Sequence, residues 1–141
     1  MKMKWTAGYE NFSDAYKVRK EVFVNEQKID EELEIDEYDE NALHLVIYKN
    51  LKPIATGRLF EQDGSFIIGR VCVLREYRSM QLGSLLMDSL IEKAISIGAK
   101  ELYLSSQVAA TGFYSRFGFF AYGDVYKDAG IDHISMVRRI R

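Results

Sequence analysis

A strand, a short basic turn and an amphipathic helix follow one another in IIGRVCVLREYRSMQLGSLLMDSLIEKAISI (Ile67–Ile97). Arg75, Arg78 and Gly83 cluster where this helix begins. Free backbone N–H groups and the positive end of the helix dipole face such a turn, so it suits an anion, and a diphosphate is the expected guest. The turn has neither the G-x-x-x-x-G-K-[ST] spacing of an ATP-binding loop nor the G-x-G-x-x-G of a dinucleotide fold. An ordinary connection with solvated arginines is the alternative interpretation.

The apolar pattern predicts a mixed α/β (α+β) fold, with residues 1–141 forming one domain. Strands are predicted at Lys4–Tyr9, Leu43–Tyr48, Ile54–Phe60, Phe66–Leu74, Glu101–Ser105, Phe119–Tyr122 and Ile131–Ile140, with a loop at Gly123–Gly130. Helices are predicted at Asn11–Asn25, capped by Asn11, and at Met80–Ile97 and Ala109–Phe117. The second to fourth strands should be antiparallel, and the fourth should be central and buried on both faces. A helical crossover makes the fifth strand parallel to the fourth.

A second segment, QVAATGFYSRFGF (Gln107–Phe119), places a Phe-Tyr pair before a helix end closed by glycine. Together with the strand, arginine-rich turn and helix, this F-Y-x-x-F-G-F motif resembles the GNAT superfamily of acetyl-CoA-dependent N-acetyltransferases over most of the chain. VRKEVFVNEQ (Val18–Gln27) and DAGIDHISM (Asp128–Met136) are similar to its small bacterial ElaA-like branch. The resemblance implies an acyl-CoA N-acyltransferase fold, with about six to seven strands, about four helices and a splayed central parallel pair whose crevice binds the ligand.

The resemblance also implies which residues hold acetyl-CoA. The main chain of the central strand would bond the pantetheine arm, and Gln107 stands where the family has an asparagine for the same arm. The residues expected to bind the cofactor are Val71, Cys72, Val73, Arg78, Ser79, Met80, Gln81, Leu82, Gly83, Ser84, Gln107 and Phe113. Where the family commonly reads R-G-x-G-x-G or R-G-x-G-x-A, this chain has Ser79 and Gln81 in place of glycines. Gln81 occupies the site of closest approach to the diphosphate, so we expect weakened but surviving binding.

Acetyl transfer to an amine needs a positioned thioester, a neutral amine, oxyanion stabilisation and a proton for the leaving thiolate. Tyr114 is at the position that the family uses to protonate the sulfur; a core tyrosine is the alternative. A backbone N–H near Val73 is the expected oxyanion donor. Glu26, at the end of the first helix, is the first choice as general base, with Asp36, Asp39 and His133 as alternatives.

The acceptor amine is expected to meet residues around the mouth of this crevice. Gln27, Asp36, Asp39, Arg58, Arg70 and His133 are the candidates. Arg58 and Arg70 are predicted on adjacent antiparallel strands, where they either present a guanidinium to a substrate carboxylate or pair with acids near Asp36. Structural roles for all of these residues stay open. No spacing of His, Asp or Glu suggests a metal site.

Composition narrows the class of protein. The net charge of −2 and the absence of a concentrated basic surface argue against nucleic-acid binding. No apolar run predicts a signal peptide or a membrane span, so a cytoplasmic location is expected.

Cys72 is the only cysteine, which excludes an internal disulfide, and its Val-Cys-Val strand favours core packing over a reactive thiol. Eight acids crowd between Lys28 and Lys49, as either a solvated loop or a rim that attracts a cation.

The sequence therefore predicts an enzyme that transfers acetyl from acetyl-CoA to a primary amine of a small molecule or peptide by direct attack. A noncatalytic acyl-CoA-binding sensor or partner-docking module is one alternative, and an acyltransferase for longer acyl chains is another. Exposed strand edges would allow a homodimer.

Overall fold

The predicted strand, turn and helix around the basic segment are all present in the computed structural model, which describes residues 1–140. Strand β4 spans Ser65–Val73 and helix α3 spans Leu82–Ser96, with a 3-10 turn at Arg75–Met80 between them. Helix α3 buries one apolar stripe against the sheet, formed by Leu82, Leu86, Met87, Leu90, Ile91 and Ala94. This stripe is the helical face that the sequence periodicity predicts.

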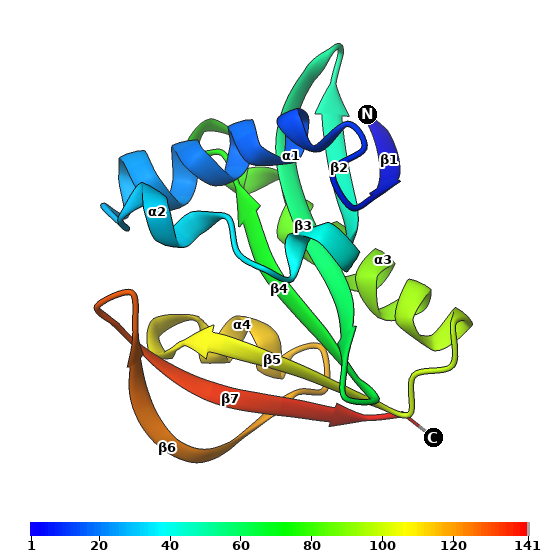
Figure 1. The fold of residues 1–141 in the computed structure, drawn as a ribbon, viewed down its shortest axis with the longest axis vertical. Coiled ribbons are helices and arrows are strands. Elements are labelled where there is room, and N and C mark those ends of the chain that lie inside the picture. The colour runs from blue at the N-terminus through cyan, green and yellow to red at the C-terminus, as the bar shows by residue number, and fades with distance from the viewer. Residues whose placement is uncertain (141) are drawn as a thin grey trace.

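Seven strands form one mixed sheet in the order β1-β2-β3-β4-β5-β7-β6 (Figure 1). Besides β4, the strands are β1 (Lys2–Ala7), β2 (Leu43–Lys49), β3 (Lys52–Gln62), β5 (Glu101–Gln107), β6 (Phe120–Asp128) and β7 (Ile131–Arg139). Strands β2, β3 and β4 are successively antiparallel, as predicted. The β4–β5 pair is parallel, as expected from the helical crossover. Strands β1 and β6 are the two edges of the sheet.

The two central parallel strands separate soon after they begin. Their ladder holds only two pairs, Phe66 with Leu102 and Ile67 with Tyr103. Beyond Ile67 the strands diverge, which Figure 1 shows as a widening gap between β4 and β5. The carboxyl half of β4 therefore has a strand partner on its β3 side only.

A β-bulge lies in this same half of β4. Thr56 pairs with Cys72 and Arg58 with Gly69, so Arg70 and Val71 together face the single residue Gly57 of β3. Arg70 takes up the irregularity with φ of 52°. The prediction that this strand is buried on both faces is wrong, because within β4 only Ile68 and Cys72 are buried, and the residues from Ile67 to Val73 line a cavity. Bulges of this kind re-aim side chains next to functional sites.

The first helix consists of an α-helical part and a π-helical part. Helix α1 (Phe12–Arg19) continues as the π-helix η1 (Lys20–Glu26), and π-helical turns are frequent at functional sites. Short helical turns follow at α2 (Glu31–Glu34) and η2 (Asp39–Asn41). The predicted cap at Asn11 is wrong, because Asn11 is left-handed (φ 53°) and its side chain bonds no helix N–H.

The C-terminal part differs from prediction in one respect. A 3-10 turn (Val108–Ala110) and helix α4 (Thr111–Ser115) fill the predicted helical segment. The predicted loop at Gly123–Gly130 is wrong, because β6 runs on to Asp128 through a register shift between Tyr122 and Tyr126. The shift absorbs Gly123, which has φ of 74°, and the real turn is at Ala129–Gly130.

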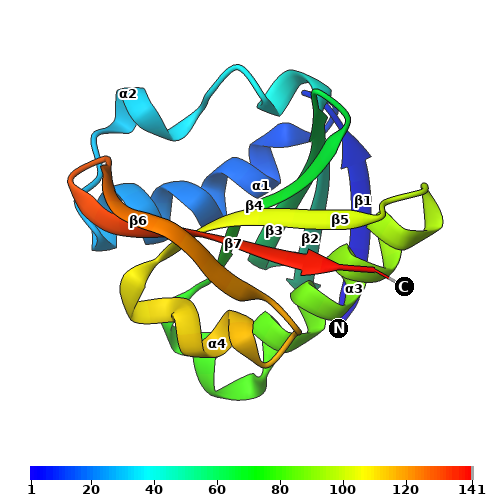
Figure 2. The ribbon, with the colours of Figure 1, turned by 90° about the horizontal axis from the view of Figure 1, so that it is seen from below.

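Helices cover both faces of the sheet. Figure 2 shows α1 and α2 on one side and α3 and α4 on the other. Helix α1 packs on β2, β3 and β4, and α3 packs on β3 and β4, so the core centres on the middle strands. None of the helices described for residues 1–140 has the length and apolar character needed to cross a bilayer.

Candidate functional site

A cavity of about 1170 Å³ opens where β4 and β5 part. Such a volume suits a large ligand. Its walls come from β4, β5, the start of α3, α4, the end of η1 and the acidic segment after it. The predicted site residues that line it are Gln27, Asp36, Arg58, Arg70, Val71, Cys72, Val73, Arg78, Ser79, Gln81, Gly83, Ser84, Gln107, Phe113, Tyr114 and His133. Four predicted residues do not line it, namely Glu26, Asp39, Met80 and Leu82.

The start of α3 has the features that an anion needs. Gln81 precedes the helix in the left-handed region (φ 58°), and no side chain caps the first helical N–H groups. A Cβ added to Gly83 would lie 3.2 Å from the ring of Phe113, so a side chain here would crowd α4 as well as the space before the helix. The uncapped amides, Gly83 and the neighbouring arginines together fit a diphosphate.

Arg78 is already engaged by a protein carboxylate. Its two terminal nitrogens each donate to one oxygen of Glu26 at 2.6 Å, and Arg75 adds a contact of 3.5 Å. The hydrogen bonds from Arg78 hold the pKa of Glu26 below its ordinary value. A lowered pKa weakens a base, and Glu26 lies outside the cavity wall. Glu26 is therefore poorly placed and too weakly basic to be the general base.

Val73 presents its main chain to the gap between the strands. Its carbonyl accepts a hydrogen bond of 3.0 Å from Nε of Arg78 rather than from β3, whereas the N–H of Leu74 bonds the carbonyl of Ile54 at the β3 edge. Because the N–H and C=O of one strand residue point the same way, the Val73 N–H also faces the gap. A main-chain donor is thus available where the resemblance expects the thioester.

Tyr114 is half-buried beside the same gap. Its ring packs against the core and makes an edge contact with Phe113, with centroids 5.1 Å apart. No described residue within 1–140 gives its hydroxyl a hydrogen-bond partner, and the residue lines the cavity. Burial raises the pKa of Tyr114 to about 12, so the phenol stays protonated at neutral pH. It is therefore a hydrogen-bond donor in the wall of the cavity.

Cys72 behaves as a packing residue in the structure. It is buried in the core, and burial raises the pKa of its thiol. A thiol that stays protonated is a poor nucleophile. Its main chain pairs with Thr56 of β3, so its prediction as a cofactor contact is not supported by a free backbone group.

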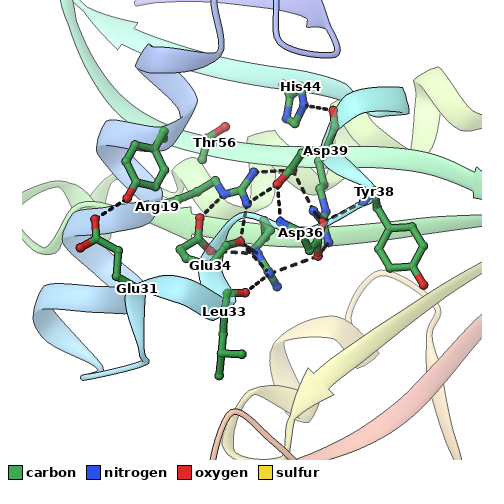
Figure 3. A network of polar contacts seen from close by, with 12 residues as sticks. Arg19, Glu31, Leu33, Glu34, Asp36, Tyr38, Asp39, His44 and Thr56 are labelled. Atoms are coloured by element: carbon green, nitrogen blue, oxygen red, sulfur yellow. Dashed lines mark hydrogen bonds and ion pairs between the residues drawn. The ribbon is translucent and has the colours of Figure 1, made fainter.

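The acidic segment folds into a buried ion network (Figure 3). Arg19 on α1 donates to Glu34 at 2.5 Å and to both oxygens of Asp39 at 2.7 and 3.0 Å. Arg58 on β3 holds both oxygens of Asp36 at 2.7 Å and one oxygen of Asp39 at 2.8 Å. Arg19 and Asp39 are only 1% and 0% exposed, so neither can meet a substrate. Asp39 is accordingly a structural residue here, contrary to its prediction as a substrate contact.

A third arginine, Arg70, extends the network to the cavity. It contacts Glu34 at 2.9 Å and Asp36 at 3.3 Å, and it also donates to the carbonyl of Glu34 at 2.8 Å. Of the two roles considered for Arg58 and Arg70, pairing with acids is the one that the structure displays. Three arginines thus face three carboxylates, so this wall is balanced in charge. Glu34, Asp36 and Asp39 are neutralised by these arginines, so they cannot contribute to a rim that attracts a cation.

The opposite wall carries polar side chains from β5, β6 and β7. Gln107 donates to Gln27 at 2.8 Å and so joins β5 to the end of η1. His133 on β7 faces Gln107 across the ladder, and its Nδ1 lies 2.8 Å from the carbonyl of Ile131. The ring of Tyr126 stacks on His133, and the hydroxyl of Tyr126 contacts that of Ser105.

Sequence reasoning missed the roles of Arg19, Glu34, Ser105 and Tyr126. Arg19 did leave a signal, because it is a charge on the otherwise apolar stripe of the first helix, a place where only a paired cation is tolerated. The other three carried none. Within residues 1–140, no three His, Cys, Asp or Glu side chains converge as metal ligands would.

Comparisons with known proteins agree with this geometry. The family model for the acetyltransferase (GNAT) domain matches residues 8–140. The uncharacterised N-acetyltransferase YjcF of Bacillus subtilis is 38% identical over 130 residues, covering 92% of this chain and 93% of its own. Protein ElaA of Escherichia coli is 32% identical over 124 residues, covering 84% and 81%.

Solved structures superpose along nearly the whole chain. An acyl-CoA N-acyltransferase from Pseudomonas aeruginosa has a TM-score of 0.88 with 29% identity, covering 98% of this chain and 99% of its own. Escherichia coli ElaA has a TM-score of 0.85 with 27% identity, covering 98% and 100%. The matched family model, these relatives and the parted central strands agree, and the chain belongs to the GNAT acetyltransferase family.

Proposed function

We propose that this protein transfers an acetyl group from acetyl-CoA to a primary amine by direct attack of the amine on the thioester. The observation that carries the proposal is the cavity between β4 and β5, whose wall includes both the uncapped start of α3 and Tyr114. A ligand with an anionic end and a reactive end could place the first at the start of α3 and the second beside Tyr114. Family membership supports acyl transfer, and the acetyl donor and the amine acceptor are the proposed refinements.

The donor side rests on main-chain groups. The first N–H groups of α3, around Gly83 and Ser84, would hold the diphosphate with Arg78. The Val73 N–H, which faces the gap, would bond the pantetheine arm or the oxyanion that forms as the amine adds. Gln107 would offer its amide to the same arm by exchanging its hydrogen bond to Gln27 for one to the ligand.

Tyr114 would supply the proton for the leaving sulfur. Its pKa of about 12 exceeds the pKa of an ordinary thiol, so full transfer to the sulfur stays uphill even after the thiolate has formed. The residue therefore stabilises the leaving sulfur mainly as a hydrogen-bond donor, and solvent replaces any proton that it gives up. Because it is protonated throughout the neutral range, we expect no loss of activity near pH 7 from its ionisation.

A thiol-release assay over a panel of amines tests the proposal, with acetyl-CoA and longer acyl-CoA donors compared side by side. We expect turnover with acetyl-CoA, and a Tyr114→Phe variant should lose about 10²-fold or more in kcat. Tight binding of acetyl-CoA with no turnover on any amine would instead indicate a noncatalytic binding module. Faster reaction with longer donors would indicate the longer-chain acyltransferase.

A further inference from the structure

The cavity has few groups able to accept a proton from an amine. Glu34 and Asp36 line it, but arginines hold both carboxylates. Asp128 lies exposed to solvent at the end of β6. Tyr38 already accepts a hydrogen bond from Gln62. His133 is the only imidazole that lines the cavity, and imidazole is the side chain that ordinarily changes charge between pH 5 and 8.

The surroundings of His133 fix the state of its ring. The carbonyl of Ile131, 2.8 Å away, can only accept a hydrogen bond, so in the neutral ring Nδ1 carries the proton and donates it. The other nitrogen, Nε2, then holds a lone pair. Among residues 1–140 no group is hydrogen-bonded to Nε2, and this nitrogen is not sealed from solvent.

The strands around His133 hold the ring in place. It is only 9% exposed, and the ring of Tyr126 stacks on it with centroids 6.2 Å apart and an interplanar angle of 27°. The contact between the hydroxyls of Tyr126 and Ser105 ties that aromatic ring to β5. A buried, oriented imidazole that lines a cavity and has one nitrogen without a protein partner has the form of a general base.

We propose that His133 is the general base of the proposed acetyl transfer and removes a proton from the acceptor amine through Nε2. This assignment rests on the proposed function. As the nitrogen bonds to the carbonyl carbon and the carbon–sulfur bond breaks, the nitrogen loses one proton to His133. Tyr114 gives one proton to the sulfur, and exchange with solvent restores both residues. The neutral amine and the thioester thus become an amide and a free thiol.

The charged groups near His133 are few. On the same hairpin, Lys127 and Asp132 pair with one another at 2.8 Å, and both are exposed. Asp128 lies at the mouth on β6, while β5 presents the uncharged Ser105 and Gln107. The base must be neutral to accept a proton, so activity should fall in acid as this ring takes up a proton.

The decisive variant is His133→Asn, whose side-chain amide can still donate to the Ile131 carbonyl but has nothing in place of Nε2. We expect kcat for the best amine of the panel to fall by about 10²-fold or more, and the acid limb of the pH profile to vanish. Affinity for acetyl-CoA in calorimetry should stay within about twofold of wild type if the role is confined to proton transfer. In a His133→Ala variant, added imidazole should restore part of the rate in proportion to its neutral fraction.

Lys127→Gln on the same hairpin is the matched control and should keep both rate and pH profile. Two results would overturn the assignment: an active His133→Asn with an unchanged acid limb, or a loss of activity that tracks a loss of acetyl-CoA affinity or of thermal stability without rescue by imidazole. A wild-type protein that releases no thiol with any amine of the panel would overturn the proposed function itself. Amine-dependent turnover by the wild type together with either of the two results above would overturn the role of His133 alone.

Discussion

Glu26 accepts two hydrogen bonds of 2.6 Å from Arg78, one at each carboxylate oxygen. The pair joins the end of the π-helix to the turn before α3, across 52 residues of sequence. Arg78 also donates its Nε to the carbonyl of Val73, so its side chain lies over the end of β4. Glu26 thus pairs with the arginine that a diphosphate would use.

A Glu26→Gln variant should bind coenzyme A more tightly, because an incoming diphosphate would no longer compete with a carboxylate for Arg78. Partly exposed ion pairs contribute roughly 0.5 to 1 kcal/mol, so we expect a gain of about two- to fivefold in calorimetry. Turnover should persist, since the pairing leaves Glu26 no part in proton transfer. Weaker binding would mean that Glu26 orients Arg78 rather than competing for it, and loss of turnover with intact binding would restore Glu26 as the base.

Gly83→Asp should abolish coenzyme A binding while leaving the fold intact. The new carboxylate would put negative charge where the diphosphate is expected, and its Cβ would lie 3.2 Å from Phe113. An acid near a helix start favours the helix itself, so thermal stability should change little. Ser89→Asp, which adds the same charge in the middle of α3, should bind like wild type in the same titration. Retained affinity in Gly83→Asp would refute the placement of the diphosphate.

Gln81→Gly should strengthen coenzyme A binding without the usual penalty of glycine. Gln81 has a left-handed backbone (φ 58°, ψ 27°), which glycine adopts without strain. This geometry gives a physical reason for the glycine that the family commonly has here. A Ser89→Gly variant inside α3 should lose about 0.5 kcal/mol of unfolding free energy, because glycine is a poorer helix former than serine, whereas Gln81→Gly should not. Equal losses in urea unfolding would show that Gln81 is not strained.

Local patterns were enough to predict the fold and the turn before α3. The helical spacing of apolar residues from Leu82 to Ala94 predicts α3, which is present. The helical crossover between β4 and β5 predicts that these strands are parallel, and they are. These signals are local because they depend on the period of apolar residues along one element. The end of β6 was mispredicted for the same reason: Gly123 looks like a loop residue, but pairing with β7 carries the strand past it.

Side-chain pairing between distant segments could not be predicted in the same way. Glu26 looks like a free acid at a helix end, and only the fold shows that Arg78 holds it. Asp39 looks like a loop acid, yet Arg19 and Arg58 bury it completely. Opposite charges in a sequence do not reveal which partners meet, because that depends on how whole elements pack.

Arg19→Ala should destabilise the protein strongly. It would leave Glu34 and Asp39 buried without their main cation, and breaking a buried pair in this way costs about 3 to 5 kcal/mol. Lys20→Ala is the matched control on the next residue, since Lys20 pairs with Glu31 at the surface at 3.2 Å and should contribute less than about 1 kcal/mol. Urea unfolding at neutral pH measures both, and similar small losses would contradict a structural role for the network.

Asp39→Asn should change how stability depends on pH. Burial alone would raise the pKa of Asp39, but the hydrogen bonds and charge of Arg19, with the charge of Arg58, hold it well below the ordinary 3.8. The folded state therefore binds its proton only at lower pH than the unfolded chain does, so this contribution is complete above about pH 4 and is lost as the pH falls further. The variant should be less stable than wild type at pH 7, and the gap should narrow between pH 4 and pH 2. Glu37→Gln, an exposed acid of the same segment, should follow the wild-type curve, whereas a constant gap for Asp39→Asn would show that its charge is not what stabilises the fold.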